Sequence, residues 1–166
     1  MRMMDDIRNH VSDYEDEEEI SAYLAKILHK EAFDRKGLIY GMGHAVYSLS
    51  DPREVIFKTF VEKLAKAKGR DKDMALYNNI EKIAPKLIAQ ERQIFKGVSP
   101  NVDFYSGFVY NMLDIPVELY TPLFAIARIA GWSAHRIEEL VSVNKIIRPS
   151  YKSLVKKQDY VGRDDR

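Results

Sequence analysis

One acidic side chain stands in an unusual setting for a charge. Asp103 lies in the segment Pro-Asn-Val-Asp-Phe-Tyr-Ser-Gly, residues 100–107, between apolar and aromatic neighbours. Burial disfavours the ionised form of a carboxyl group, so an aspartate in such a place can be tuned toward proton transfer. Aspartates with apolar neighbours also cap helices or accept hydrogen bonds from backbone N–H groups, so the residue by itself leaves both roles open.

A second segment supplies an acid or hydrogen-bond donor. His44 follows two glycines in the run Gly-Met-Gly-His-Ala-Val-Tyr, residues 41–47. Glycines adopt backbone angles that other residues avoid, and they let a ligand approach main-chain donors closely. The Gly-x-Gly spacing alone is a weak nucleotide-binding signal, because the strand and helix that such a loop joins are missing. A histidine next to glycines is more often structural, so His44 becomes a candidate acid only together with other groups.

Three arginines are candidates for binding a carboxylate, because a guanidinium is always charged and offers a planar fork of donors. Arg53 follows Asp51 and Pro52 near the start of a predicted helix. Arg128 lies inside the most apolar stretch of the chain, where an unpaired charge is costly, so we expect an anionic partner from the protein or a ligand. Arg148 precedes a proline and is otherwise an ordinary loop residue.

The elements that must position these residues are predicted to be helices. Apolar residues recur at helical spacing on one face of each of two predicted helices: Ile20, Tyr23, Leu24, Ile27 and Leu28 in the first, and Ile56, Phe57, Phe60, Val61 and Leu64 in the second. The order Asp-Pro-Arg-Glu from residue 51 is typical of a helix start, with Asp51 as its cap. No alternating strand of useful length appears, so the predicted fold class is all-α, a multi-helical domain. The last helix is apolar on most of its surface, and we expect it to be buried on most sides. We predict helices over residues 16–30, 51–69, 73–95, 104–113 and 117–143, and a loop over 36–47.

Composition narrows the class of protein. A chain of 166 residues with 46% hydrophobic residues suits one domain or part of a larger protein. The net charge of +1 gives no support for a nucleic-acid or membrane-surface partner. Because the chain has no cysteines, it has no disulfides and no thiolate metal ligands. The spacing of the other potential ligands matches no metal site. The absence of cysteines fits the cytoplasmic location that we expect. The first residues are acidic where a signal peptide has an apolar run.

Taken together, the segments resemble the citrate synthase family. Members carry G-x-G-H-[AR]-V, then D-P-R, then P-N-V-D, and this chain has all three in that order. Phe124 and Arg128 match a further F-x-x-x-R-x-x-G stretch. The resemblance covers nearly all of the chain but only the C-terminal part of the family's fold. It implies that residues 1–113 correspond to the small domain and that residues 114–166 belong to the segment that returns to the large domain.

The resemblance also implies roles for individual residues. Asp103 matches the catalytic base that removes a methyl proton from acetyl-coenzyme A, and His44 matches the donor to the carbonyl oxygen of oxaloacetate. Substrate binding falls to Arg53, Phe124, Arg128 and Arg148, the last across a dimer interface. Coenzyme A acts as a co-substrate and not as a permanently bound cofactor, and its expected contacts are Leu38, Ile39, Tyr40, Gly41, Met42 and Asn101.

One departure from the family pattern limits what the isolated chain is expected to do. The family's other active-site histidine, in a His-Gly-Gly motif, has no counterpart here. We therefore expect a C-terminal part of a citrate synthase-like acyltransferase that is inactive by itself and that self-associates as a homodimer or a larger assembly. Two alternatives stay open: part of a 2-methylcitrate synthase, which uses propionyl-coenzyme A, and a non-catalytic helical fragment that only associates.

Overall fold

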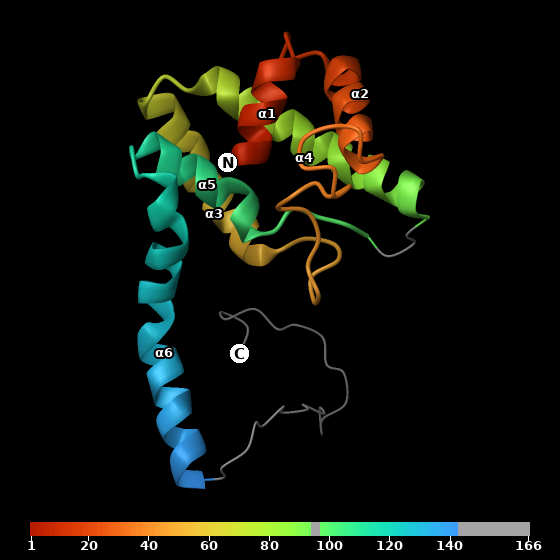
Figure 1. Ribbon diagram of the computed structural model, residues 1–166. Helices are drawn as coiled ribbons and strands as arrows, with labels where there is room; N and C mark the ends of the chain where they lie inside the picture. Colours follow the sequence, from red (N-terminus) through yellow and green to blue (C-terminus); the bar gives the residue numbers. More distant parts are fainter. Residues whose placement is uncertain (94–96, 143–166) are drawn as a thin grey trace, which may run out of the picture. The chain divides into compact units, whose positions relative to one another are not determined.

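The fold is built from helices joined by loops (Figure 1). The structure, a computed structural model, describes residues 1–93 and 97–142, so Arg148 and the end of the predicted helix 73–95 lie outside the described residues. Within them the only β structure is an isolated antiparallel bridge between Met42 and Pro100, and the all-α prediction is confirmed. The elements are α1 (Arg2–His10), α2 (Glu17–Leu28), α3 (Pro52–Ala67), α4 (Asp71–Arg92), α5 (Val102–Met112), the 3-10 turn η1 (Val117–Leu119) and α6 (Tyr120–Ser142).

The chain divides into two compact units, Met1–Leu123 and Phe124–Arg166. The first unit contains α1 to α5, and the second begins within α6. The division falls ten residues after the predicted end of the small domain, close to the start of the long C-terminal helix.

Side-chain caps fix where three helices of the first unit begin. Asp16 accepts hydrogen bonds from the backbone N–H groups of Glu18 and Glu19 at 2.9 and 3.1 Å, which starts α2. Asp51 and Asn101 cap α3 and α5 in the same way, and Pro52 occupies the first helical position of α3. Caps of this kind satisfy N–H groups that have no partner inside the helix. The predicted cap and start of α3 are confirmed.

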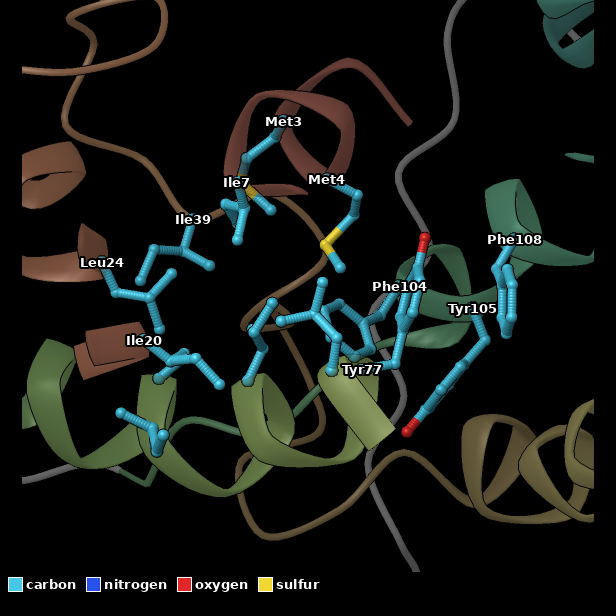
Figure 2. Packing of buried hydrophobic residues seen from close by; sticks show 14 of the residues in the cluster. Met3, Met4, Ile7, Ile20, Leu24, Ile39, Tyr77, Phe104, Tyr105 and Phe108 are labelled. Carbon is cyan, nitrogen blue, oxygen red and sulfur yellow. The ribbon is translucent and has the colours of Figure 1, made fainter. Parts of the chain in front are cut away.

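The hydrophobic core lies around α4. Figure 2 shows side chains of α1, α2 and α5 turned toward this helix, where Tyr77 lies in the aromatic part of the cluster. The Tyr77 ring stacks on Phe108 with a centroid distance of 4.6 Å and meets Phe104 edge-on at 5.3 Å. The predicted apolar stripe of α2 is confirmed, because Leu28 is partly buried against the core and the other four of its five members are buried: Ile20, Tyr23, Leu24 and Ile27.

Helix α1 was missed by sequence reasoning. Its signal is short but present: Met3, Met4 and Ile7 lie on one face and are buried, Asp5 is in the first turn and Arg8 in the last. This arrangement buries apolar groups and complements the helix dipole. The α5 helix begins at Val102, two residues before the predicted start, because Asn101 is its cap.

The expected burial of the last long helix is wrong for this chain. No described residue of α6 is buried. Its apolar side chains need a partner surface, and the core cluster includes no residue after Met112. Large apolar side chains are therefore exposed along the helix, among them Ile126, Ile129 and Leu140.

None of the helices in residues 1–93 and 97–142 has the length and apolar character needed to cross a membrane.

Candidate active site

Two loop segments that are distant in sequence are joined side by side. The N–H of Gly43 donates to the Ser99 carbonyl at 2.8 Å, and the N–H of Asn101 donates to the Gly41 carbonyl at 2.8 Å. The side-chain amide of Asn101 adds a hydrogen bond to the Gly43 carbonyl at 2.8 Å, across 58 residues of chain. In Figure 1 the orange loop that precedes α3 reaches the green segment that leads into α5. The glycine-histidine segment and the start of α5 are thereby held together.

The close approach of these segments requires glycine at position 41. Its φ is +87°, a region that other residues rarely adopt. A Cβ atom there would lie 2.8 Å from the Cα of Phe104, inside the closest distance that real Cβ atoms reach. Gly43 has a similar φ of +88° but open space around it. Gly41 is thus needed for packing against α5, whereas Gly43 is needed only for its backbone conformation.

The tautomer of His44 follows from its backbone neighbours. Its Nδ1 accepts hydrogen bonds from the N–H groups of Val46 and Tyr47 at 3.0 and 3.2 Å. Because a backbone N–H can only donate, Nδ1 is unprotonated in the neutral ring and the proton resides on Nε2. The Nη2 atom of Arg53 lies 3.4 Å from Nε2. Two donors therefore stand next to each other, close enough for one oxygen atom of a ligand to accept from both.

Arg53 is held by Asp51, which has no exposed surface. The guanidinium donates from Nε to Oδ1 at 2.9 Å and from Nη2 to Oδ2 at 2.7 Å, a bidentate pair. The hydrogen bonds from Arg53, opposed by burial, lower the pKa of Asp51 to about 2. The same pair raises the pKa of Arg53, and the negative charge of Asp103 contributes to that shift. The buried carboxylate of Asp51 therefore fixes the orientation of Arg53, and about half of the Arg53 side chain is still exposed.

Asp103 lies in the first turn of α5, and its carboxylate is exposed. Its backbone N–H donates to the cap oxygen of Asn101 at 2.9 Å. The expectation that this carboxylate is desolvated is wrong for this chain. Phe104 and Tyr105 turn into the core, and successive residues of a helix point about 100° apart, so Asp103 faces outward.

A small cavity of about 240 Å³ lies beside Asp103. Three residues expected to contact coenzyme A line it: Tyr40, Gly41 and Asn101. The other three expected contacts do not. Ile39 is buried in the core, so its side chain is not available for such a role, whereas Leu38 and Met42 are partly exposed outside the cavity lining. The remaining lining residues are Met1, Met3, Met4 and Phe104.

The predicted substrate residues of α6 lie in the second unit. The Arg128 guanidinium carbon lies 4.4 Å from the centre of the Phe124 ring, one helical turn away. Both residues are exposed, and the expected anionic partner of Arg128 is not found among the described residues. A cation–π contact with Phe124 and solvent stabilise the charge in its place. No group of three or more potential metal ligands occurs in the part of the chain that the structure describes.

Two residues of the site were not singled out from the sequence for these roles. Asp51 was predicted only as a helix cap, and its second contact with Arg53 could have been inferred from the i, i+2 spacing of the Asp-Pro-Arg run. Tyr47 gave no signal. Its ring lies 4.8 Å from the His44 ring and 5.5 Å from the Arg53 guanidinium carbon, so it supports both side chains.

The fold defines an all-helical protein, and a histidine, an arginine and an aspartate gathered at joined loops are the kind of cluster found in active sites. The comparisons with known proteins identify the family. The model for the citrate synthase C-terminal domain matches residues 1–150. The chain belongs to the citrate synthase family.

Relatives and solved structures agree with this assignment. The chain is 42% identical over 146 residues to a citrate synthase from Synechocystis sp., covering 88% of this chain and 34% of the relative. It is 39% identical to a 2-methylcitrate synthase from Shewanella oneidensis, covering 80% of this chain and 31% of that relative. The crystal structure of citrate synthase from Pyrobaculum aerophilum superposes with a TM-score of 0.59 at 29% identity, covering 99% of this chain and 38% of that one. The chain thus spans about a third of the length of the curated relatives it matches.

Proposed function

We propose that this chain provides the C-terminal part of a citrate synthase-type acyltransferase that condenses acetyl-coenzyme A with oxaloacetate to give citrate, in the tricarboxylic acid cycle and in the cytoplasm. In this proposal residues 1–113 act as the small domain and residues 114–166 as the returning segment of the large domain. Coenzyme A is a co-substrate. The matched family and its relatives support the proposal.

The observation that carries the proposal is the joining of the two loops. The bridge at Met42 and Pro100 brings the His44 and Arg53 donors near the start of α5, where Asp103 is located. The effect of Asp103 on the pKa of Arg53 supports their proximity. A base, a neutral donor and a fixed cation are the groups that a carbon–carbon condensation between a thioester and a dicarboxylate requires.

Each group has a defined task in the proposed reaction. The carboxylate of Asp103 takes a proton from the methyl group of the thioester, and the resulting carbon nucleophile forms a bond to the carbonyl carbon of oxaloacetate. The carbonyl oxygen, which gains the electron pair, accepts a hydrogen bond from the Nε2–H of His44 and takes a proton from the solvent, to which Asp103 returns the proton that it removed. Arg53 binds a carboxylate of oxaloacetate, as do Arg128 and Arg148 in the complete enzyme, where Phe124 lines the pocket. Water then releases coenzyme A from the thioester.

Coenzyme A is proposed to bind at the loop before His44. The cavity next to Asp103 supports this position, because Tyr40, Gly41 and Asn101 line it. Leu38, Ile39 and Met42 would contribute through their backbone.

Propionyl-coenzyme A is the alternative acyl donor. This second candidate is favoured by the similarity to the 2-methylcitrate synthase from Shewanella oneidensis, to which this chain is 39% identical. The residues proposed for chemistry are the same in both reactions.

Ligand binding to the chain itself tests the proposal. In NMR titrations, oxaloacetate is expected to shift the side-chain signals of His44 and Arg53, and coenzyme A the backbone signals of Gly41 and Asn101. Arg53→Gln should weaken the oxaloacetate response at least tenfold and leave the coenzyme A response unchanged. The matched control is Arg136→Gln, which removes an arginine paired with Glu139 at 2.8 Å on α6. Equal responses of the two variants, or no shifts with millimolar ligand, would contradict the proposal.

Turnover is tested separately with a thiol-release assay. We expect none from the isolated chain with acetyl-coenzyme A and oxaloacetate, because the family's His-Gly-Gly donor is not in this sequence. Loss of one donor to a developing oxyanion costs about 3–4 kcal/mol of transition-state stabilisation. Thiol release that disappears in Asp103→Ala would show that the chain is sufficient for catalysis and that the expected inactivity is wrong.

A further inference from the structure

A polar cluster that is buried at Glu54 and Tyr105 and partly exposed at its other two members joins three helices of the first unit, and the proposed reaction does not use it. We call it the Glu54 cluster: Glu54 and Lys58 on α3, Glu81 on α4 and Tyr105 on α5. The Nζ of Lys58 lies 2.6 Å from Oε2 of Glu81, and the Tyr105 hydroxyl donates to the same oxygen. One carboxylate of α4 therefore ties α3 and α5 together.

Glu54 is the member of the cluster without an assigned partner. Its residue is 3% exposed, and its Oε1 is enclosed without a hydrogen-bond partner among the described residues. The nearby ammonium group, Lys58, already pairs with Glu81. Two carboxyl groups thus share one cation, and a second negative charge in this space would be buried and uncompensated. A neutral, protonated Glu54 avoids that penalty.

The groups that face Glu54 come from every element packed around it. Asp51, at the cap of α3, and Glu81, on α4, are negative, and Lys58, one turn along α3, is positive. Tyr105 on α5 is neutral, and burial raises its pKa, with Glu81 and Glu54 adding to the shift. Burial first, and then the charge of Glu81, raise the pKa of Glu54 to about 7, while Lys58 lowers it.

We propose that Glu54 is a proton-binding site of the folded chain, and that ionisation of Glu54 loosens the α3–α4–α5 junction and thereby shifts Arg53. On ionisation the proton passes to water. Lys58, four residues along the same helix, is then attracted to Glu54 as well as to Glu81, which weakens the tie to α4. Arg53 precedes Glu54 on α3, so it senses the change. The inference goes beyond the proposed reaction and does not depend on it.

The sign of the pH effect follows from the direction of the shift. The folded chain holds the Glu54 proton at pH values where the unfolded chain has lost it. Stability from this site is therefore fully present below the ordinary glutamate pKa and is lost as the pH rises through about 7. Glu54→Gln keeps the shape of the protonated side chain and should remove this pH dependence.

The test is an NMR titration of the whole chain with ¹³C-labelled glutamate. We expect the Cδ signal of Glu54 to titrate near pH 7 and the Nε–Hε signal of Arg53 to move with the same midpoint. Glu54→Gln should abolish that movement. The matched control is Glu62→Gln, which makes the same change at an exposed position of α3 and should leave both titrations unaltered. The comparison also separates the effect from any influence of His44, which lies next to Arg53.

Two results would overturn the inference. A Glu54 signal that titrates in the ordinary glutamate range would remove the proton-binding site. A Glu54 midpoint near 7 with an Arg53 signal that moves equally in wild type and Glu54→Gln would remove the link to Arg53. If Glu54→Gln does not fold, the wild-type titration still decides the first point, and the midpoint of Arg53 in His44→Gln decides the second.

Discussion

Asp51 has two roles: it caps the start of α3, and it fixes the orientation of the Arg53 side chain. Its Oδ1 accepts from the backbone N–H of Arg53 at 3.0 Å, and both of its oxygens accept from the guanidinium. Asparagine caps helices as well as aspartate does, so Asp51→Asn removes the charge and leaves the cap. The substitution therefore isolates the part of the interaction that positions Arg53.

For Asp51→Asn we expect a loss of about 1–3 kcal/mol of unfolding free energy, the usual cost of leaving a buried polar partner unmatched. The control Asp16→Asn makes the same change at the exposed cap of α2 and should stay within about 0.5 kcal/mol. Urea unfolding at neutral pH measures both. Because the folded pKa of Asp51 is lowered to about 2, the difference from wild type should shrink as the pH falls from about 4 toward 2. Equal losses in the two variants would mean that the Arg53 pair adds nothing.

A second prediction at this scale concerns the two glycines before His44. Gly43→Ala introduces only backbone strain, about 1–2 kcal/mol, because nothing lies near the new Cβ. Gly41→Ala adds a collision with the backbone of Phe104, so it should be clearly more destabilising. Thermal unfolding of the two variants checks the order. A Gly43→Ala variant that is equal to or less stable than Gly41→Ala would show that α5 shifts easily.

At the scale of elements, the contact between α2 and α4 stabilises the unit that carries the loops. Leu24 has no exposed surface, so Leu24→Ala should cost about 2–5 kcal/mol through lost burial and a cavity. Leu49→Ala removes the same atoms from a side chain that is 91% exposed and should change stability by less than about 0.5 kcal/mol. Chemical denaturation compares them. Similar values would indicate that α2 adds little to the core.

The helices could be predicted to the extent that local chemistry defines them. The Asp-Pro-Arg start of α3 and the stripe of α2 were predicted because a cap or an apolar period is contained in a few neighbouring residues. The predicted face of α3 was too broad: Val61 is buried, but Ile56 and Phe60 are exposed. Periodicity identifies the apolar side of a helix. How many residues of that side are buried depends on which other helices pack against it.

The site could be predicted only in part for a similar reason. The motif residues His44, Arg53 and Asp103 were all named from the sequence, and in the structure Nε2 of His44 lies 3.4 Å from Nη2 of Arg53. The hydrogen bonds of Asn101 to Gly43 and of His44 to its own loop depend on backbone positions that no residue pattern specifies. The exposure of Asp103 and of Arg128 likewise depends on which surfaces surround them and not on their immediate neighbours in sequence.

At the scale of the whole molecule, α6 carries an apolar surface that nothing in the described residues buries. Contiguous exposed apolar area tends to become an interface. We therefore expect the chain to form a dimer or a larger assembly at micromolar concentration. Replacing Ile126 and Ile137 together by glutamate should shift it toward monomer, whereas Leu49→Glu, an exposed position of the first unit, should not. Light scattering after gel filtration gives the masses, and a monomeric wild-type chain would refute the expectation.

The bridge between Met42 and Pro100 also affects the order of events during folding. It closes a long stretch of chain that contains α3 and α4, and long closures lower the entropy of the chain before they gain any contact. Each of the two helices can form from local contacts, but the loops can pair only after both have folded back on each other. His44 and Asp103 should therefore come together late during folding. Substitutions in the α3–α4 hairpin that touch neither residue would then slow the appearance of ligand-binding competence, while the helical signal recovers at its earlier rate.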